Sequence, residues 1–140
     1  MALSDINTKP TQEMADEATQ GLEWREEFGR GGTEVGVARA RDIKNRANLS
    51  IRTVKRMYSY LSRHEVDKEG QGFYSGDEGY PSAGRIAWAL WGGDPGFAWT
   101  KRKIAEIERY IVVDDASRTT WDIHFTPRLL DLQVVDRFVI

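Results

Sequence analysis

The chain has 140 residues, no cysteine, 40% hydrophobic residues and a formal net charge of −2, which predicts one globular domain over residues 1–140 with a sizeable core. The lack of cysteine excludes disulfides, thiolate zinc sites and cysteine nucleophiles, and it fits a reducing compartment. Because no apolar run approaches the roughly 18 residues of a membrane span, and residues 1–10 lack the features of a signal peptide, we expect a cytoplasmic protein without a membrane partner.

Glycine stops and the helical spacing of apolar residues predict five helices in the first part of the chain. They are expected over residues 10–28, 34–47, 51–64, 83–91 and 97–110. Ser50 and Ser82 stand where an N-cap is expected. Residues 1–9 lack such a pattern, so we expect a loose arm there, and the glycines within residues 66–81 predict a long loop.

The end of the chain has a different character. Residues 111–140 contain β-branched or alternating segments separated by Asp, Ser and Pro, which predicts short strands. Residues 10–110 should therefore form a helical core and residues 111–140 a strand-like tail. The aromatic residues near the last two helices have helical spacing and are expected in the core more than on a base-stacking surface; they are Trp88, Trp91, Phe97 and Trp99.

Charge is segregated along the chain. Residues 36–63 hold eight basic residues and one acidic residue, a net of +7, whereas residues 11–35 carry −5 and residues 64–84 carry −4. A basic block between two acidic blocks suggests a surface that faces a polyanion. The alternative is that acidic and basic helices form salt bridges with one another inside one bundle.

Residues 43–58 contain the features of a helix-turn-helix unit. Ala47 is the small residue where two helices would touch, Asn48 tolerates a left-handed turn, and Leu49 is an apolar plug. Six residues are expected to be buried together: Ile43, Ala47, Leu49, Val54, Met57 and Leu61. The segment resembles the helix-turn-helix of bacterial and phage DNA-binding proteins, with the motif near residues 35–64. The resemblance implies a mainly α, helix-turn-helix-containing helical domain, to which the tail adds a small C-terminal β element.

The same resemblance implies a nucleic-acid interface, because the second helix of such a unit enters the major groove of duplex DNA. Arginine and lysine suit guanine O6 and N7, and basic residues of the preceding helix would lie near phosphates. The candidate nucleic-acid-binding residues are Arg41, Lys44, Arg46, Ser50, Ile51, Arg52, Lys55, Arg56 and Ser59. Helix-turn-helix proteins often dimerise, and the strand-like tail is a candidate homodimer interface. The alternative is a helical hairpin whose basic face is only solvated.

A second resemblance covers more of the chain, about residues 10–103. Residues 31–41, 63–68 and 79–96 are similar to a domain of tailed bacteriophages that occurs near head-maturation proteins. The resemblance implies a viral setting, in the host cytoplasm, and no particular reaction. It is compatible with DNA binding and equally with the alternative function, a structural or head-assembly protein without catalytic activity.

No arrangement of residues predicts an enzyme. His64 and His124 are the only histidines, and His64-Glu65 is not followed by the second histidine of a zinc helix. The glycines from residue 70 to residue 79 do not form a phosphate-binding loop, and a Gly-x-Ser-x-Gly elbow is absent. The sequence therefore predicts no catalytic residue, no metal site, no cofactor and no small-molecule substrate.

Overall fold

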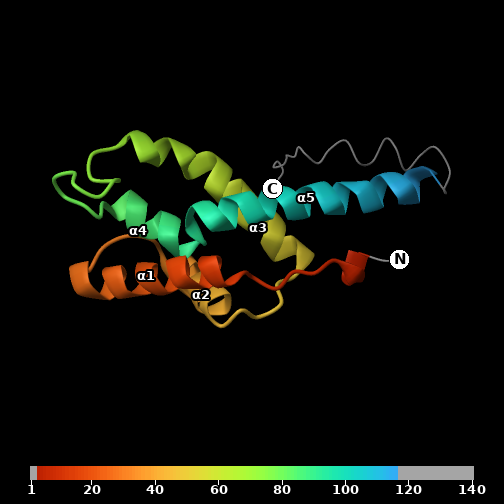
Figure 1. Cartoon of the computed structure of the whole chain (residues 1–140), viewed down its shortest axis with the longest axis horizontal. Helices are drawn as coiled ribbons and strands as arrows, with labels where there is room; N and C mark the ends of the chain where they lie inside the picture. Colours follow the sequence, from red (N-terminus) through yellow and green to blue (C-terminus); the bar gives the residue numbers. More distant parts are fainter. Residues whose placement is uncertain (1–2, 117–140) are drawn as a thin grey trace.

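The computed structural model describes residues 3–116, which form five α-helices and two short 3-10 helices (Figure 1). The α-helices are α1 (Gln12–Phe28), α2 (Glu34–Lys44), α3 (Ile51–His64), α4 (Ala83–Leu90) and α5 (Gly93–Ala116). The 3-10 helices are η1 (Leu3–Asp5) and η2 (Glu65–Glu69). The described part of the chain is therefore mainly α, as predicted.

The last helix corrects one expectation about the C-terminal part. The β-branched composition of residues 111–113 predicts a strand, yet these residues continue α5, which begins at Gly93, before the expected residue 97, and runs to Ala116. β-propensity is a weak preference, and the helix that precedes these residues overrides it. The remaining predicted strands, within residues 119–140, lie outside the described residues.

Side-chain caps set the beginning of four helices. Thr11, Thr33, Ser50 and Ser82 have extended backbone, and each side-chain oxygen accepts a hydrogen bond from the backbone N–H three residues on. Such a cap satisfies one of the donors that the first helical turn leaves without a partner. α1 ends where Gly29 takes a left-handed φ of 65°, which costs glycine no strain. The caps predicted at Ser50 and Ser82 are confirmed.

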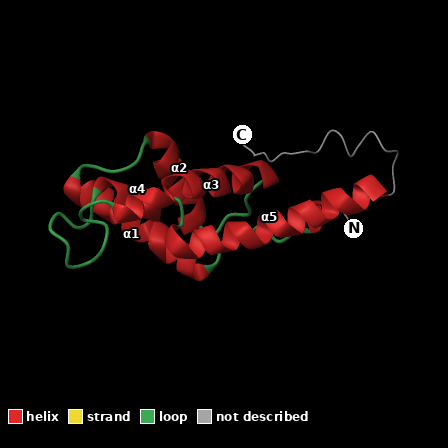
Figure 2. Cartoon of the chain, turned by 90° about the horizontal axis from the view of Figure 1, so that it is seen from above, coloured by secondary structure: helices red, strands yellow, loops and turns green. Residues whose placement is uncertain are grey.

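The helices form two groups around one core. α1 packs against α2 and α4, whereas α3 packs against α5, and α1 also contacts α5. In Figure 1 α1 runs along the lower side of the molecule and α3 crosses toward the upper side. Figure 2 shows the long α5 extending past the other helices. All five helices contribute fully buried side chains to the core, for example Met14, Ile43, Met57, Trp88 and Ile107.

The aromatic residues near α4 and α5 belong to this core. Trp88, Trp91, Phe97 and Trp99 are each at most 7% exposed. Trp88 packs edge-on against Phe97, with ring centroids 5.8 Å apart. The prediction that these side chains are core residues is confirmed.

The first described residues correct a second expectation. Ile6 and Thr8 are buried, and the backbone N–H of Leu49 donates to the carbonyl of Thr8 at 3.2 Å. The Arg46 Nε donates to the carbonyl of Pro10 at 2.8 Å. This segment therefore lies against the turn between α2 and α3 and is not a loose arm. Its partners lie far along the chain, so no local pattern could reveal them.

The predicted loop at residues 66–81 is partly helical and well attached. It begins within η2, and the Lys68 Nζ lies 2.9 Å from Oδ1 of Asp94 on α5. At its far end the Arg30 Nη2 donates to the carbonyl of Pro81 at 2.9 Å. The loop thus connects the end of α3 to the start of α4 along a defined path.

Candidate nucleic-acid interface

One face of α3 carries three exposed arginines. Arg52, Arg56 and Arg63 are exposed, and Ser59 between them is half-buried. At 3.6 residues per turn these four positions fall within about 60° of the helix circumference. We call these four residues the α3 stripe.

The opposite face of α3 belongs to the core. Of the six residues predicted to be buried together, five are buried, namely Ile43, Leu49, Val54, Met57 and Leu61. Rotating α3 to turn its arginines inward would expose its own buried side chains, Val54, Met57 and Leu61, to water, which is unfavourable. The α3 stripe is therefore held toward solvent.

The arginines of the α3 stripe are not neutralised by other side chains within residues 3–116. No ion pair in that range includes Arg52, Arg56 or Arg63. On α1, Glu17 pairs with Arg85 of α4 instead. Arg52 and Arg56 are exposed as predicted, and the alternative of salt bridges from α1 to these arginines does not describe the contacts.

Lys55 borders the α3 stripe, on the side of α3 that contacts α5. Burial lowers the pKa of Lys55, and the negative charge of Glu108 on α5 partly offsets that effect. One turn further on, Tyr58 meets Phe97 of α5, with ring centroids 6.2 Å apart. The expectation that Lys55 is exposed like Arg52 and Arg56 is therefore met only in part, because Lys55 is half-buried on the side of α3 that contacts α5.

Replacing Lys55 with methionine is expected to raise the free energy of unfolding slightly at neutral pH. Because the pKa of Lys55 is lower in the folded chain than in the unfolded chain, the charged form opposes folding below the folded-state pKa. Methionine has a similar length and removes this charge. Urea unfolding should show a benefit that shrinks as the pH rises toward the ordinary lysine value of 10.5, and a destabilised variant at neutral pH would contradict the assignment.

The turn before α3 does not follow the predicted helix-turn-helix pattern in detail. α2 ends at Lys44, Ala47 is exposed, and Arg46 takes a positive φ of 53° in place of Asn48. The predicted contact of the two helices through Ala47, and the left-handed turn at Asn48, are therefore wrong. The reason is that Arg46 already turns the chain, where its side chain binds the N-terminal segment.

The other candidate residues near α3 have mixed roles. Ser50 caps the helix, since its Oγ accepts from the Thr53 N–H at 3.0 Å. Ile51 is half-buried and packs against the core. Lys44 is exposed at the end of α2. Arg46 is half-buried and committed to a backbone carbonyl, so a phosphate would have to share its guanidinium.

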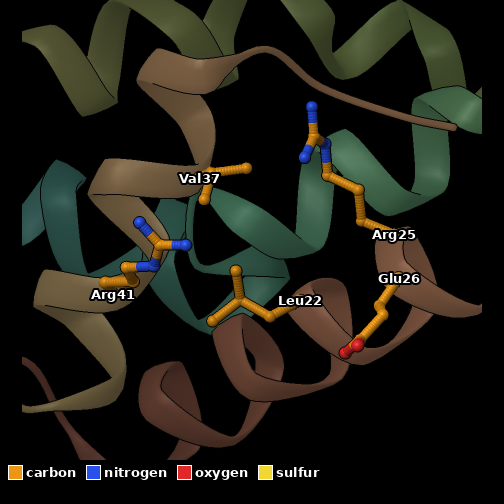
Figure 3. A pocket seen from close by; sticks show the side chains of 5 residues that line it. All are labelled: Leu22, Arg25, Glu26, Val37 and Arg41. Atoms are coloured by element: carbon orange, nitrogen blue, oxygen red, sulfur yellow. The ribbon is translucent and has the colours of Figure 1, made fainter. Parts of the chain in front are cut away.

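Arg41 lies at a groove between α1 and α2. The groove has a volume of about 440 Å³ and is lined by Leu22, Arg25, Glu26, Val37 and Arg41. Figure 3 shows the Leu22 and Val37 side chains facing each other, with the two arginines at the sides. Arg41 is therefore part of the α1–α2 side of the molecule, where Glu26 adds a negative charge, and is not an extension of the α3 stripe.

Arg63 is the residue that sequence reasoning missed. It is exposed in the last turn of α3 and completes the α3 stripe. Its position was visible in the sequence, since 52, 56, 59 and 63 follow the i, i+4, i+7, i+11 spacing of one helix face.

The described residues hold neither a metal-binding cluster nor a membrane-spanning helix. Within residues 3–116, no three His, Asp or Glu side chains gather closely enough to hold a metal ion. Over the same stretch, every helix is too short or too polar to cross a bilayer.

Comparisons with known proteins identify no relative. No protein-family model matches the chain, and no curated protein or solved structure is significantly similar to it.

Proposed function

We propose that the chain binds nucleic acid, duplex DNA in particular, through the α3 stripe, in the cytoplasm of the cell that makes it. The observation that carries the proposal is the exposure of Arg52, Arg56 and Arg63 on one helix face without an acidic partner in residues 3–116. Binding of a nucleic acid to such a row of arginines is favoured because each phosphate contact releases condensed counterions.

Arginine is well suited to this role. Its planar guanidinium donates two parallel hydrogen bonds to one phosphate or to one guanine edge. From Arg52 to Arg63 the α3 stripe spans about 16 Å along the helix axis, the length of about five base-pair steps. The three arginines can therefore reach separate phosphates.

The helix-turn-helix hypothesis adds a direction to the docking. In such motifs the N-terminal part of the second helix meets the base edges. Arg52 and Arg56 stand in that part of α3 and suit guanine contacts, whereas Arg63 and Lys44 suit phosphates. Because α2 and α3 do not meet through Ala47, the proposal depends on α3 itself and not on a compact two-helix unit.

The triple variant Arg52→Ala, Arg56→Ala, Arg63→Ala is expected to lose most of its duplex binding. Each lost phosphate contact should reduce the slope of log affinity against log salt by about 0.9. Loss of an arginine that meets a guanine should cost about 1–3 kcal/mol and relax sequence preference at that position. The measurement is fluorescence anisotropy with a labelled duplex at low and moderate salt.

A matched control removes three exposed cations from other surfaces. Lys9, Arg102 and Arg109 are exposed and lie outside α3, so their replacement by alanine changes the net charge equally. The control should bind nearly as well as the unmodified chain. Equal losses in both triple variants would mean that only net charge matters, and absence of salt-sensitive binding by the unmodified chain would refute the proposal.

A structural role in phage head assembly is the second candidate. The observation that favours it is a charge match between the exposed faces of α1 and α3.

A further inference from the structure

The exposed face of α1 carries a row of acids that has no basic partner within the described residues. Asp16, Glu23 and Glu27 are exposed, and Gln20 between them is half-buried. Asp16 accepts a hydrogen bond only from the neutral side chain of Gln12, at 2.9 Å. We call Asp16, Gln20, Glu23 and Glu27 the α1 stripe.

The two stripes match in spacing as well as in charge. Along α1 the acids are separated by seven residues and then by four. Along α3, counted from Arg63 backward, the arginines are also separated by seven and then by four. In an α-helix these separations correspond to about 10.5 Å and about 6 Å.

We infer that the α1 stripe of one copy docks antiparallel on the α3 stripe of a second copy. In this register every polar position meets a complementary one, as Asp16–Arg63, Gln20–Ser59, Glu23–Arg56 and Glu27–Arg52. A parallel arrangement brings only two acids opposite arginines and leaves Glu23 opposite Ser59. Charge and spacing together therefore select the antiparallel orientation.

Within one copy, the α1 stripe and the α3 stripe do not pair with each other. α1 packs on α2 and α4 while α3 packs on α5, and the two helices run along different sides of the molecule (Figure 1). The contact is thus between different patches of two copies, and each copy in a pair keeps one stripe free. Such head-to-tail contacts build rings or open chains.

The contact should be weak and sensitive to salt. Exposed ion pairs are screened by solvent and by added ions, and two helix faces bury less surface than a stable dimer requires. Self-association is therefore expected at high protein concentration and low ionic strength.

The first test is sedimentation velocity of the full chain without nucleic acid. The unmodified chain should form species larger than a monomer at low salt and return to monomer at moderate salt. The variant Asp16→Asn, Glu23→Gln, Glu27→Gln should remain monomeric throughout. A control that neutralises three exposed acids elsewhere, Glu65→Gln, Glu69→Gln and Glu78→Gln, should associate like the unmodified chain; association that persists in the α1 variant would overturn the inference.

The second test fixes the register, and the absence of cysteine from the chain makes it clean. A mixture of Gln20→Cys and Ser59→Cys variants should form a disulfide-linked heterodimer at low salt, because these positions oppose each other in the antiparallel register. Pairing Gln20→Cys with Arg56→Cys, which oppose each other only in the parallel register, should give much less. The reference mixture is Gln20→Cys with Ala98→Cys, an exposed site on α5. If Gln20→Cys with Ser59→Cys gives no more heterodimer than this reference mixture, the docking is contradicted.

These tests separate self-association from nucleic-acid binding. The neutralised α1 variant keeps all three arginines, so it should lose self-association and retain duplex binding. A chain that associates without binding any nucleic acid would support the docking and refute the proposed function. A chain that stays monomeric and binds duplex DNA would refute the docking and support the proposed function.

Discussion

Trp88→Ala is expected to lower the free energy of unfolding by about 3–5 kcal/mol. Trp88 is 2% exposed, and its ring also packs edge-on against Phe73, with ring centroids 6.3 Å apart. Its Nε1 donates to Oδ1 of Asp94 at 3.0 Å. Truncation would therefore leave a cavity between α4 and α5 and remove a hydrogen bond from a carboxylate, a loss comparable to a large part of a typical domain's stability.

Two variants give this prediction its controls. Trp88→Phe keeps most of the ring and should lose clearly less than Trp88→Ala. Val66→Ala changes a side chain that is 61% exposed and should stay within about 0.5 kcal/mol of the unmodified chain. Urea unfolding followed by far-ultraviolet circular dichroism measures all three, and a loss below about 1.5 kcal/mol for Trp88→Ala would show that the core collapses around the gap.

Part of the loss in free energy of unfolding caused by replacing Trp88 should depend on pH. Burial raises the pKa of Asp94, but hydrogen bonds from Lys68 and Trp88 and nearby positive charges outweigh it, and the pKa is lowered overall. A carboxyl with a lowered folded-state pKa stabilises the fold above its unfolded value of 3.8, and this contribution disappears as the pH falls through the folded-state pKa. The difference in free energy of unfolding between Trp88→Phe and the unmodified chain should accordingly become smaller at acidic pH.

Arg85→Met is expected to destabilise the fold by about 2–4 kcal/mol. The Arg85 guanidinium binds the Glu17 carboxylate through two contacts, at 3.1 Å and 3.3 Å, and it lies 5.0 Å from the ring centroid of Trp24. The Arg85 and Glu17 side chains are only 16% and 24% exposed. Methionine would leave the Glu17 charge largely buried without its partner, which costs more than the pair itself contributes.

Companion variants separate the charge from the packing. Arg85→Lys should recover only part of the loss, because an ammonium group cannot form the two parallel contacts. Adding Glu17→Gln to Arg85→Met should restore stability, since the buried charge is then removed. If the double variant is as unstable as Arg85→Met, the loss comes from packing against Trp24 and not from the unpaired carboxylate.

The proposed nucleic-acid binding and the inferred self-association would compete for the same arginines. A phosphate backbone and the α1 stripe of a second copy are both negatively charged rows, and each would occupy Arg52, Arg56 and Arg63. The acidic block before the basic block, residues 11–35, thus has a candidate role, because it contains the α1 stripe that would complement the α3 stripe of another copy.

Local patterns in the sequence predicted that five helices form in residues 10–110. Ser50 and Ser82 cap α3 and α4 where predicted, and Gly29 ends α1, because caps and stops act within one helical turn. Helical periodicity also identified Val54, Met57 and Leu61 as the buried face of α3 and Arg52 with Arg56 as its exposed face.

The sequence by itself thus determined a mainly helical chain, the start of α3 and of α4, most of the core-facing residues and the concentration of positive charge on α3, whereas the end of α2 and both ends of α5 differ from the prediction. Only the tertiary structure decided which cations are free, because that depends on neighbours distant in sequence: α5 half-buries Lys55, and the segment before α1 binds Arg46 and replaces the expected contact at Ala47. The tertiary structure likewise decided that the α1 and α3 stripes are exposed, since a helix period places residues on one face but does not say which helices cover that face.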